Sequence, residues 1–252
     1  SMFLGIDTAS EFDISGAGLS DGTYKIVAIA KDDSDLVKLD KSTMTQTVEW
    51  VVKIDSTDAS AQTYGTKAND VITTGSKNDT LIVGAGDDQI SSGAGNDIIT
   101  LPTNVTGNAD IRSGDGVDII TLANAKGIDM INVGGTNINL IDKSAQSHTA
   151  IISDKIINFD PNSDKIGIGS ITATSNNFLA ETGATNFGDA LSKSNVAMAS
   201  GKQYYFSYNV ASAAEGFGLL FYDNDNNGSS DIFLTLTGIT TNVITHENLI
   251  IV

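Results

Sequence analysis

One segment of the sequence repeats itself every nine residues. Four units begin at Gly65, Thr74, Val83 and Ser92. Each unit has an aspartate at its sixth position and an isoleucine or leucine two residues later; the pairs are Asp70/Ile72, Asp79/Leu81, Asp88/Ile90 and Asp97/Ile99. A short, fixed period of this kind is typical of a small structural unit that stacks on copies of itself.

The repeat continues with interruptions. After three extra residues at Pro102 it resumes with Ile111 and Ile120, and after two more it reaches Ile131 and Leu140, although Ala109 and Ile138 replace aspartates. Three residues around each apolar position can form a short strand whose middle side chain points into a core. The other six must reverse the chain, for which glycine supplies positive φ angles. Two units therefore predict one flat coil, and many units predict a stack of coils.

The aspartates of such a stack converge. Carboxylates from successive turns would lie close together, where their mutual repulsion is unfavourable without a counter-charge. A hard divalent cation resolves the repulsion, and Ca²⁺ accepts many oxygen ligands in irregular geometry. The alternative is a cation-free solenoid with ordinary Asp-Gly turns, which does not require an acid at every turn. The regular aspartates favour calcium as the cofactor.

These units resemble the RTX family, whose nonapeptide has the form G-G-x-G-x-D-x-U-x. The resemblance is strongest over GAGDDQISSGAGNDIITL (84–101) and SGDGVDIITL (113–122), whereas Lys67, Ala68 and Lys77 depart from the pattern. It implies a parallel β-roll with calcium between turns, in a protein exported by a type I secretion apparatus. The residues that it assigns to calcium or to the turn geometry are Asp70, Asp79, Gly84, Gly86, Asp87, Asp88, Gly93, Gly95, Asp97, Gly114, Gly116 and Asp118, with Asp115 as a further candidate.

A different pattern precedes the repeat. The segments GTYKIVAIAKD (22–32) and QTVEWVVKID (46–55) alternate apolar and polar residues, which predicts half-buried antiparallel strands. This stretch resembles the second half of a bacterial immunoglobulin-like domain. We therefore expect residues 1–62 to form an incomplete immunoglobulin-like β-sandwich that acts as an extender.

The region after the repeat contains more strand-like segments. ISDKIINFDPNSDKIGI (152–168) resembles segments that follow RTX arrays, and LLFYDNDNNGSSDIFLTLTGI (219–239) resembles hairpins near the ends of exported and S-layer-like proteins. Residues 186–201 are a helix candidate, with Asp189 near its start and Gly201 as its cap. Tyr205 and its neighbours are expected to divide between the core and the surface of one strand.

The sequence therefore predicts an all-β protein in three parts. These are the partial immunoglobulin-like β-sandwich (1–62), an RTX β-roll (63–148), and a C-terminal β-rich cap with a type I secretion-signal region (149–252).

A second candidate calcium site lies in the third part. The segment DNDNNGSSD opens like an EF-hand loop, but Leu234 stands where a bidentate glutamate is expected. A tight hairpin turn explains the same composition. The candidate ligands are Asp223, Asp225, Asn227 and Asp231.

Charge and composition exclude several classes of binding partner and of site. The chain has 31 acidic and 14 basic residues, a formal net charge of −17, which opposes binding to nucleic acid or anionic lipid. It has no cysteine, which excludes disulfides and thiolate metal sites, and no apolar run long enough to span a bilayer. The pair His246-Glu247 lacks the second histidine of a zinc protease motif, and Asp160-Pro161 is expected to form a turn.

These observations favour a binding and structural role without catalysis. We expect the calcium-binding C-terminal region of a large secreted bacterial surface protein, of adhesin or S-layer type. Calcium would drive folding after export and support attachment to a host or cell-surface ligand, or self-assembly. The first alternative is a non-catalytic RTX secretion tail of an exported hydrolase. The second is a calcium-dependent glycan- or peptide-binding module.

Overall fold

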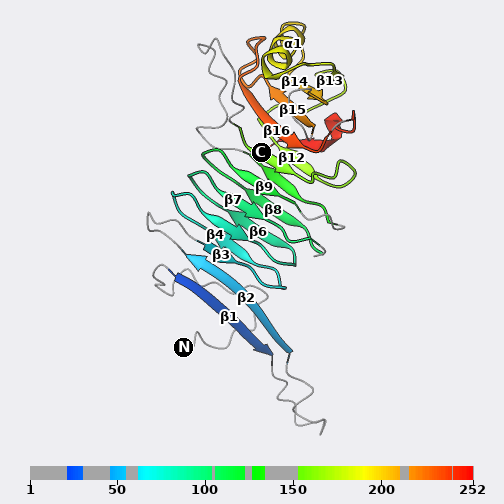
Figure 1. Ribbon diagram of the computed structural model, residues 1–252. Coiled ribbons are helices and arrows are strands. Elements are labelled where there is room, and N and C mark those ends of the chain that lie inside the picture. The colour runs from blue at the N-terminus through cyan, green and yellow to red at the C-terminus, as the bar shows by residue number, and fades with distance from the viewer. Residues whose placement is uncertain are drawn as a thin grey trace.

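The nine-residue units alternate between two β-sheets that face each other (Figure 1). The computed structural model describes residues 22–30, 46–54, 62–103, 106–122, 127–133, 153–210, 216–239 and 241–251. Within these residues, sheet A holds eight strands and sheet B nine. Successive units contribute to sheet B, then A, then B again, so that two units make one coil, as the sequence predicts.

The roll strands are short and pair in parallel with strands two units away. Those of sheet B are β3 (Gln62–Tyr64), β5 (Thr80–Ile82), β7 (Ile98–Thr100), β9 (Ile119–Thr121) and β11 (Lys155–Ile157). Those of sheet A are β4 (Val71–Thr73), β6 (Asp88–Ser91), β8 (Ala109–Arg112), β10 (Met130–Asn132) and β12 (Lys165–Gly167). The parallel β-roll expected from the sequence is thus present.

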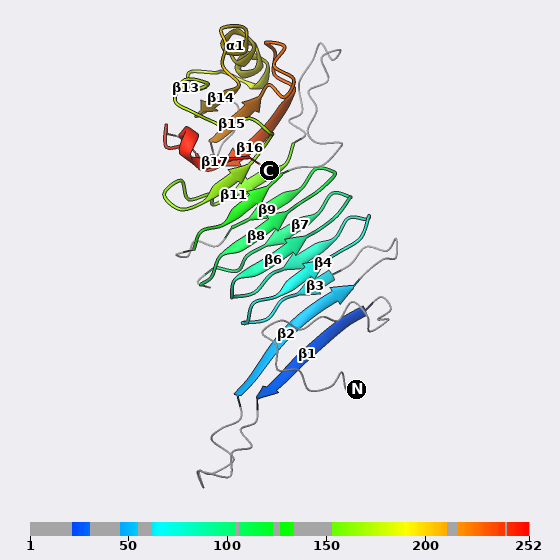
Figure 2. The ribbon, with the colours of Figure 1, turned by 180° about the vertical axis from the view of Figure 1, so that it is seen from behind.

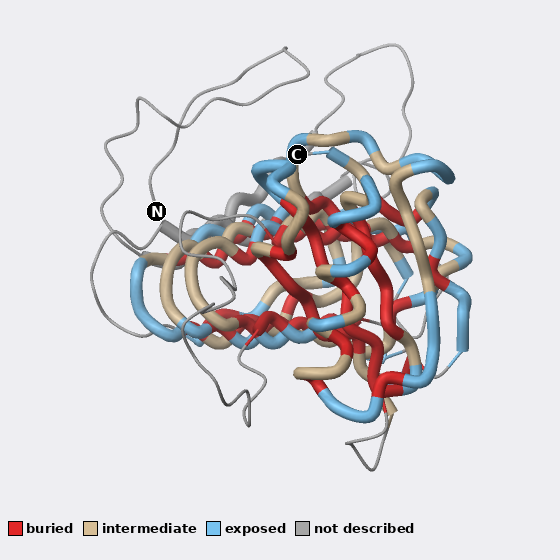
Figure 3. Tube along the Cα trace, turned by 90° about the horizontal axis from the view of Figure 1, so that it is seen from above, coloured by how far each residue is buried: buried red, intermediate tan, exposed pale blue. Residues whose placement is uncertain are grey.

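The apolar positions form one column on each sheet, and the two columns meet in the core. Leu81 aligns with Ile99 and then Ile120 in sheet B, while Ile72 aligns with Ile90 in sheet A. Each of these side chains is at most 3% exposed. Burial of one such side chain contributes roughly 1.5–3 kcal/mol. Figure 3, which looks along the stack, shows buried residues on the facing strands and more exposed residues at the bends. The predicted apolar positions are confirmed through Ile131, and Leu140 lies outside the described residues.

The stack continues past residue 148, where the sequence analysis ended the roll. Strand β11 pairs with β9, and β12 pairs with β10, which places Ile156 and Ile166 in the two apolar columns. The segments SDKII and SDKIG are therefore roll units that the interrupted spacing had concealed.

The N-terminal segment extends sheet A. Strands β1 (Gly22–Ala30) and β2 (Gln46–Ile54) form the predicted antiparallel pair, with Ile26 opposite Trp50. Strand β2 then pairs in parallel with β4, so the hairpin adds to the roll at one end. The rest of the expected immunoglobulin-like sandwich falls outside the described residues and stays a prediction.

The C-terminal region extends sheet B. Strand β16 (Ile232–Thr237) pairs in parallel with β11, and β15 (Phe217–Tyr222) and β14 (Tyr204–Tyr208) follow as antiparallel neighbours. Strand β13 (Phe178–Thr182) completes this side. Figure 2 shows the sheet passing from the roll into this region. The expected β-rich region is present, and its sheet is continuous with the roll.

One helix, α1 (Phe187–Ala199), covers this extension of sheet B, and its position matches the predicted helix over residues 186–201. It begins where the Asn186 side chain accepts a hydrogen bond from the backbone N–H of Asp189 at 3.0 Å. Gly201, with φ +94°, follows its end. The Phe187 ring packs 4.7 Å, centroid to centroid, from Phe233.

Because α1 covers the outer face of the sheet, β14 is buried on both sides. Tyr204 and Phe206 pack into the roll core, whereas Tyr205 packs with the residues beneath the helix. The expectation that this strand would present one face to solvent is wrong, since alternation in the sequence cannot reveal a distant helix that covers the second face.

The last described strand, β17 (Leu249–Ile250), pairs with β12 and closes sheet A. It follows the short 3₁₀ helix η2 (His246–Asn248). The buried Asn248 side chain donates to the backbone carbonyls of Pro161, at 2.8 Å, and Asp164, at 3.3 Å. No helix among the described residues is long and apolar enough to cross a membrane.

Candidate metal centre

The turns of the roll lie along two edges. The turns that lead from sheet B to sheet A form what we call the first edge. The residues at the sixth position of these turns are Asp70, Asp88, Ala109, Asp129 and Asp164. The turns that lead from sheet A to sheet B form the second edge. The residues at their sixth position are Asp79, Asp97, Asp118 and Asp154. All eight of these aspartates are at most 4% exposed.

On the second edge each carboxylate binds the preceding turn. Oδ1 of Asp97 accepts from the backbone N–H of Asp79 at 2.8 Å, and Oδ1 of Asp118 accepts from that of Asp97 at 2.9 Å. Oδ1 of Asp154 continues the series with the N–H of Asp118 at 2.8 Å. The second oxygens, Oδ2, of Asp97 and Asp118 are buried and have no hydrogen-bond partner. A dry carboxylate oxygen of this kind fits a bound cation.

The first edge has the same series with more protein partners. Oδ1 of Asp88 accepts from the N–H of Asp70 at 2.8 Å, and Oδ1 of Asp129 accepts from that of Ala109 at 3.0 Å. Both carboxylate oxygens of Asp70 accept hydrogen bonds from Thr66 in its own turn.

Glycine is required where successive turns approach each other. A Cβ atom on Gly93 would lie 2.0 Å from the carbonyl oxygen of Gly75, and one on Gly114 would lie 1.8 Å from that of Gly93. Both residues also have positive φ, +94° and +87°. The predicted turn glycines at 84, 86, 95 and 116 share both properties. They bring carbonyl-bearing backbone against the neighbouring turn, next to the aspartates.

Burial makes these carboxylates hard to ionise. Burial, together with the charge of Asp154 and against the opposing hydrogen bond from Asp97, raises the pKa of Asp118 to about 7. Burial likewise raises the pKa values of Asp88, Asp97 and Asp129 to about 6. Desolvation and like charges both favour the protonated form. A cation that replaces the protons would remove the same unfavourable interaction.

Three aspartates of these columns, Asp129, Asp154 and Asp164, are not among the predicted ligands. Each stands two residues before a buried isoleucine, the spacing found in the first four units. The signal was present, but insertions between units hid it. Ala109 aligns with Asp88, which confirms that an alanine occupies an aspartate position of the repeat. Ile138 lies outside the described residues.

The fifth position of the unit forms a second ladder, also missed. Oδ1 of Asn78 accepts from the N–H of Asn96 at 2.8 Å, and Oδ1 of Asn96 accepts from that of Val117 at 3.0 Å. The candidate ligand Asp87 belongs to this exposed ladder, since its Oδ1 accepts from the N–H of Asn108 at 2.9 Å. Asp115 lies beside Ala94 as an isolated bridge between turns. These fifth-position side chains accept hydrogen bonds from the following turn, whereas the buried sixth-position aspartates accept them from the preceding turn.

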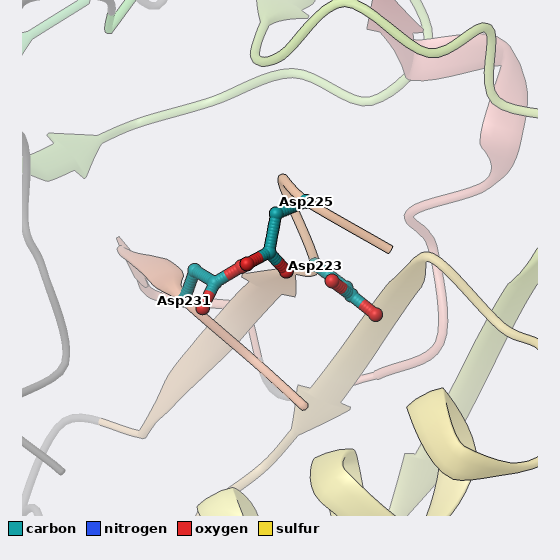
Figure 4. Close-up of side chains that lie close together, drawn as sticks. All are labelled: Asp223, Asp225 and Asp231. Atoms are coloured by element: carbon teal, nitrogen blue, oxygen red, sulfur yellow. The ribbon is translucent and has the colours of Figure 1, made fainter. Parts of the chain in front are cut away.

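The predicted EF-hand-like segment forms the loop between β15 and β16. Figure 4 shows Asp223, Asp225 and Asp231 together; one carboxylate oxygen from each lies within 4.8 Å of the others. The Asn227 side chain instead donates to Asp225 at 2.7 Å. Asn226 and Gly228 have positive φ, as a tight turn requires. One metal ion can contact all three carboxylates, and calcium ligation here stays a prediction.

The expected turn at Asp160-Pro161 is present. Residues 161–163 form a turn, and the backbone N–H of Asp164 donates to the carbonyl oxygen of Asp160 at 2.8 Å. The turn connects β11 to β12 on the first edge.

Comparison with known proteins identifies the repeat. Residues 64–99 match the family described as RTX calcium-binding nonapeptide repeat (4 copies). A solved structure, the solution structure of the AlgE6R3 subunit from the Azotobacter vinelandii mannuronan C5-epimerase, is 17% identical, with 77% of this chain and 80% of that chain covered and a TM-score of 0.27. The search of curated proteins gives no match. RTX nonapeptide repeats bind Ca²⁺ and are typical of secreted proteins, so the match supports calcium as the cofactor of the repeat over residues 64–99.

Proposed function

We propose that this chain is a non-catalytic, calcium-folded region of a secreted bacterial surface protein of the adhesin or S-layer type. The observation that carries the proposal is the stacking of Asp97 and Asp118, buried carboxylates whose Oδ2 atoms have no hydrogen-bond partner. Ionised carboxylates in such surroundings are strongly unfavourable unless a counter-ion accompanies them.

The chain's own residues provide the remaining elements of a calcium switch. Asp79, Asp97 and Asp118 would hold calcium, together with backbone oxygens of the glycine turns. Bound calcium supplies the positive charge that offsets their repulsion. Where calcium is scarce, as in the cytosol, the repulsion among the aspartates destabilises the folded state, which favours export. Extracellular calcium modules bind with Kd values of roughly 10⁻⁴–10⁻³ M, which suits folding after export.

Circular dichroism tests the switch. The full chain is measured in EDTA and then in millimolar calcium, with magnesium at the same concentration as the control. We expect β-sheet signal and a higher melting temperature with calcium, and much smaller changes with magnesium. Identical spectra and identical melting in EDTA and calcium would contradict the proposal.

The surface role has its own test. Light scattering with calcium distinguishes an S-layer protein, which forms ordered higher assemblies, from an adhesin region, which stays monomeric. The coding sequence upstream of Ser1 distinguishes both from the tail of an exported hydrolase. Tandem immunoglobulin-like repeats there support a surface protein, and a hydrolase motif contradicts it. A calcium-dependent signal on a glycan array would instead support a ligand-binding module.

A further inference from the structure

Between β4 and β9 the two edges of the roll differ in regularity. There the second-edge turns 74–79, 92–97 and 113–118 have the same length, whereas the first-edge connection from β7 to β8 contains an insertion after Leu101. Beyond β9, a longer connection lies on each edge, from β9 to β10 on the first and from β10 to β11 on the second. The second-edge turns therefore stack in one register. The N–H of Ala94 donates to the carbonyl of Gly75 at 3.0 Å, and the N–H of Gly95 donates to that of Asp115 at 2.8 Å.

The edges also differ in how many of their carboxylate oxygens have hydrogen-bond partners. On the second edge, the adjacent residues Asp97 and Asp118 each have a buried Oδ2 atom without a hydrogen-bond partner. Two carboxylate oxygens from neighbouring turns are thus buried without a hydrogen-bond partner, which is unfavourable for a charged group unless a counter-ion is present.

The first edge contains no such adjacent pair among its described turns. Asp70 is bound at both oxygens by Thr66. Ala109 places a methyl group between Asp88 and Asp129. At the far end, Oδ1 of Asp164 accepts from the N–H of Asp129, and its Oδ2 accepts from that of Asp160.

We infer that high-affinity calcium binding is concentrated at the second edge, in the two spaces between turns 74–79, 92–97 and 113–118. On the first edge, hydrogen bonds occupy Asp70 and Asp164, and Ala109 interrupts the column of carboxylates. This inference rests on the proposed calcium switch and adds an asymmetry to it. The matched family repeats do not distinguish the edges, since Asp88 and Asp97 occupy the same position of two consecutive units within residues 64–99.

Matched asparagine variants test the asymmetry. Asp97→Asn and Asp118→Asn alter the second edge; Asp88→Asn and Asp129→Asn are their first-edge controls. Asparagine keeps the Oδ1 acceptor, and all four residues accept one backbone N–H through Oδ1, so each variant can retain the same backbone hydrogen bond. Calcium affinity and stoichiometry are measured on the full chain by calorimetry and by competition with a fluorescent chelator.

We expect each second-edge variant to lose calcium affinity by about tenfold or more, and each first-edge variant to stay within about threefold of the parent. Equal losses on both edges, or a larger loss on the first, would overturn the inference while leaving the calcium switch intact. A parent chain that binds no calcium would instead refute the switch itself.

A measurement on the unsubstituted chain guards against variants that fail to fold. Backbone amide exchange is compared with and without calcium at saturating and sub-saturating concentrations. Protection is expected first at residues 92–97 and 113–118. Protection that appears first or equally at residues 83–88 would also overturn the inference.

Discussion

The backbone N–H of Asp97 donates to Oδ1 of Asp118 at 2.9 Å, across 21 residues of sequence. One oxygen of the Asp118 carboxylate therefore fastens a turn to the turn before it, while the other oxygen is buried without a hydrogen-bond partner. The same side chain stabilises the stack through geometry and destabilises it through charge. Which effect dominates depends on the cation.

Asp118→Asn should change stability in opposite directions with and without calcium. At about pH 8, above the pKa of about 7, the substitution removes a buried charge and keeps the Oδ1 acceptor. We expect a higher melting temperature in EDTA and a lower one in calcium, each by several degrees, since about 1 kcal/mol corresponds to roughly 2–4 °C in a chain of this size. Scanning calorimetry measures both, and a shift of the same sign in the two buffers would contradict the assignment.

The metal-free chain should become more stable as the pH falls. The pKa values of Asp88 and Asp97 rise from 3.8 to about 6, and that of Asp118 to about 7, so the folded state binds protons that the unfolded state does not. The free energy of unfolding should therefore increase from about pH 7 towards about pH 4. Urea denaturation in EDTA measures this trend.

With calcium present, the chain should lose stability, rather than gain it, as the pH falls. Protons compete with the cation for the carboxylates, so the stabilisation by calcium should decline below about pH 6. Parallel pH profiles in EDTA and in calcium would count against metal binding at these aspartates.

Gly93→Ala should be far more damaging than Gly201→Ala. Both glycines have φ +94°, so both alanines carry the same left-handed strain, roughly 1–2 kcal/mol. The Gly93 Cβ would lie 2.0 Å from the carbonyl oxygen of Gly75, whereas nothing lies within 4 Å of the Gly201 Cβ. We expect a total loss of roughly 3 kcal/mol or more at Gly93, measured by urea denaturation in calcium. Equal losses would mean that the turns do not approach as described.

Ala109→Asp should create a calcium site on the first edge. The new carboxylate would stand between Asp88 and Asp129 in a buried column. We expect lower stability than the parent in EDTA and a higher calcium stoichiometry by calorimetry. Ala109→Asn, which has nearly the same shape without the charge, should add no calcium. A gain of calcium in both variants would show that shape, not charge, was responsible.

The repeated pattern predicted much of the roll, because glycine turns and a buried apolar position constrain the backbone strongly. The columns of Ile72 and Leu81 follow directly from the spacing. The spacing failed at Asp154 and Asp164, where long connections separate units that pair side by side. Contacts between distant segments restore the pattern in space without restoring it in sequence.

The sequence predicts which aspartates face neighbouring turns, but it does not predict which of their oxygens are available to a metal ion. Position in the repeat indicates that Asp88 and Asp97 face neighbouring turns, and both do. Spacing cannot tell which oxygens already have partners, because that depends on Thr66 at one turn and on the absence of a carboxylate at Ala109 in another. The double burial of β14 was unpredictable for a similar reason, since α1 supplies its cover.

The pairing of each roll strand with the strand two units away has a consequence for how such a molecule can vary in size. A coil touches its immediate neighbours, so inserting or deleting one whole pair of units would rejoin equivalent surfaces and leave every other coil unchanged. The distance between the N-terminal hairpin and the helix-covered end can therefore be set by the number of coils. The molecule is in this respect an adjustable spacer, with a length that changes in fixed steps.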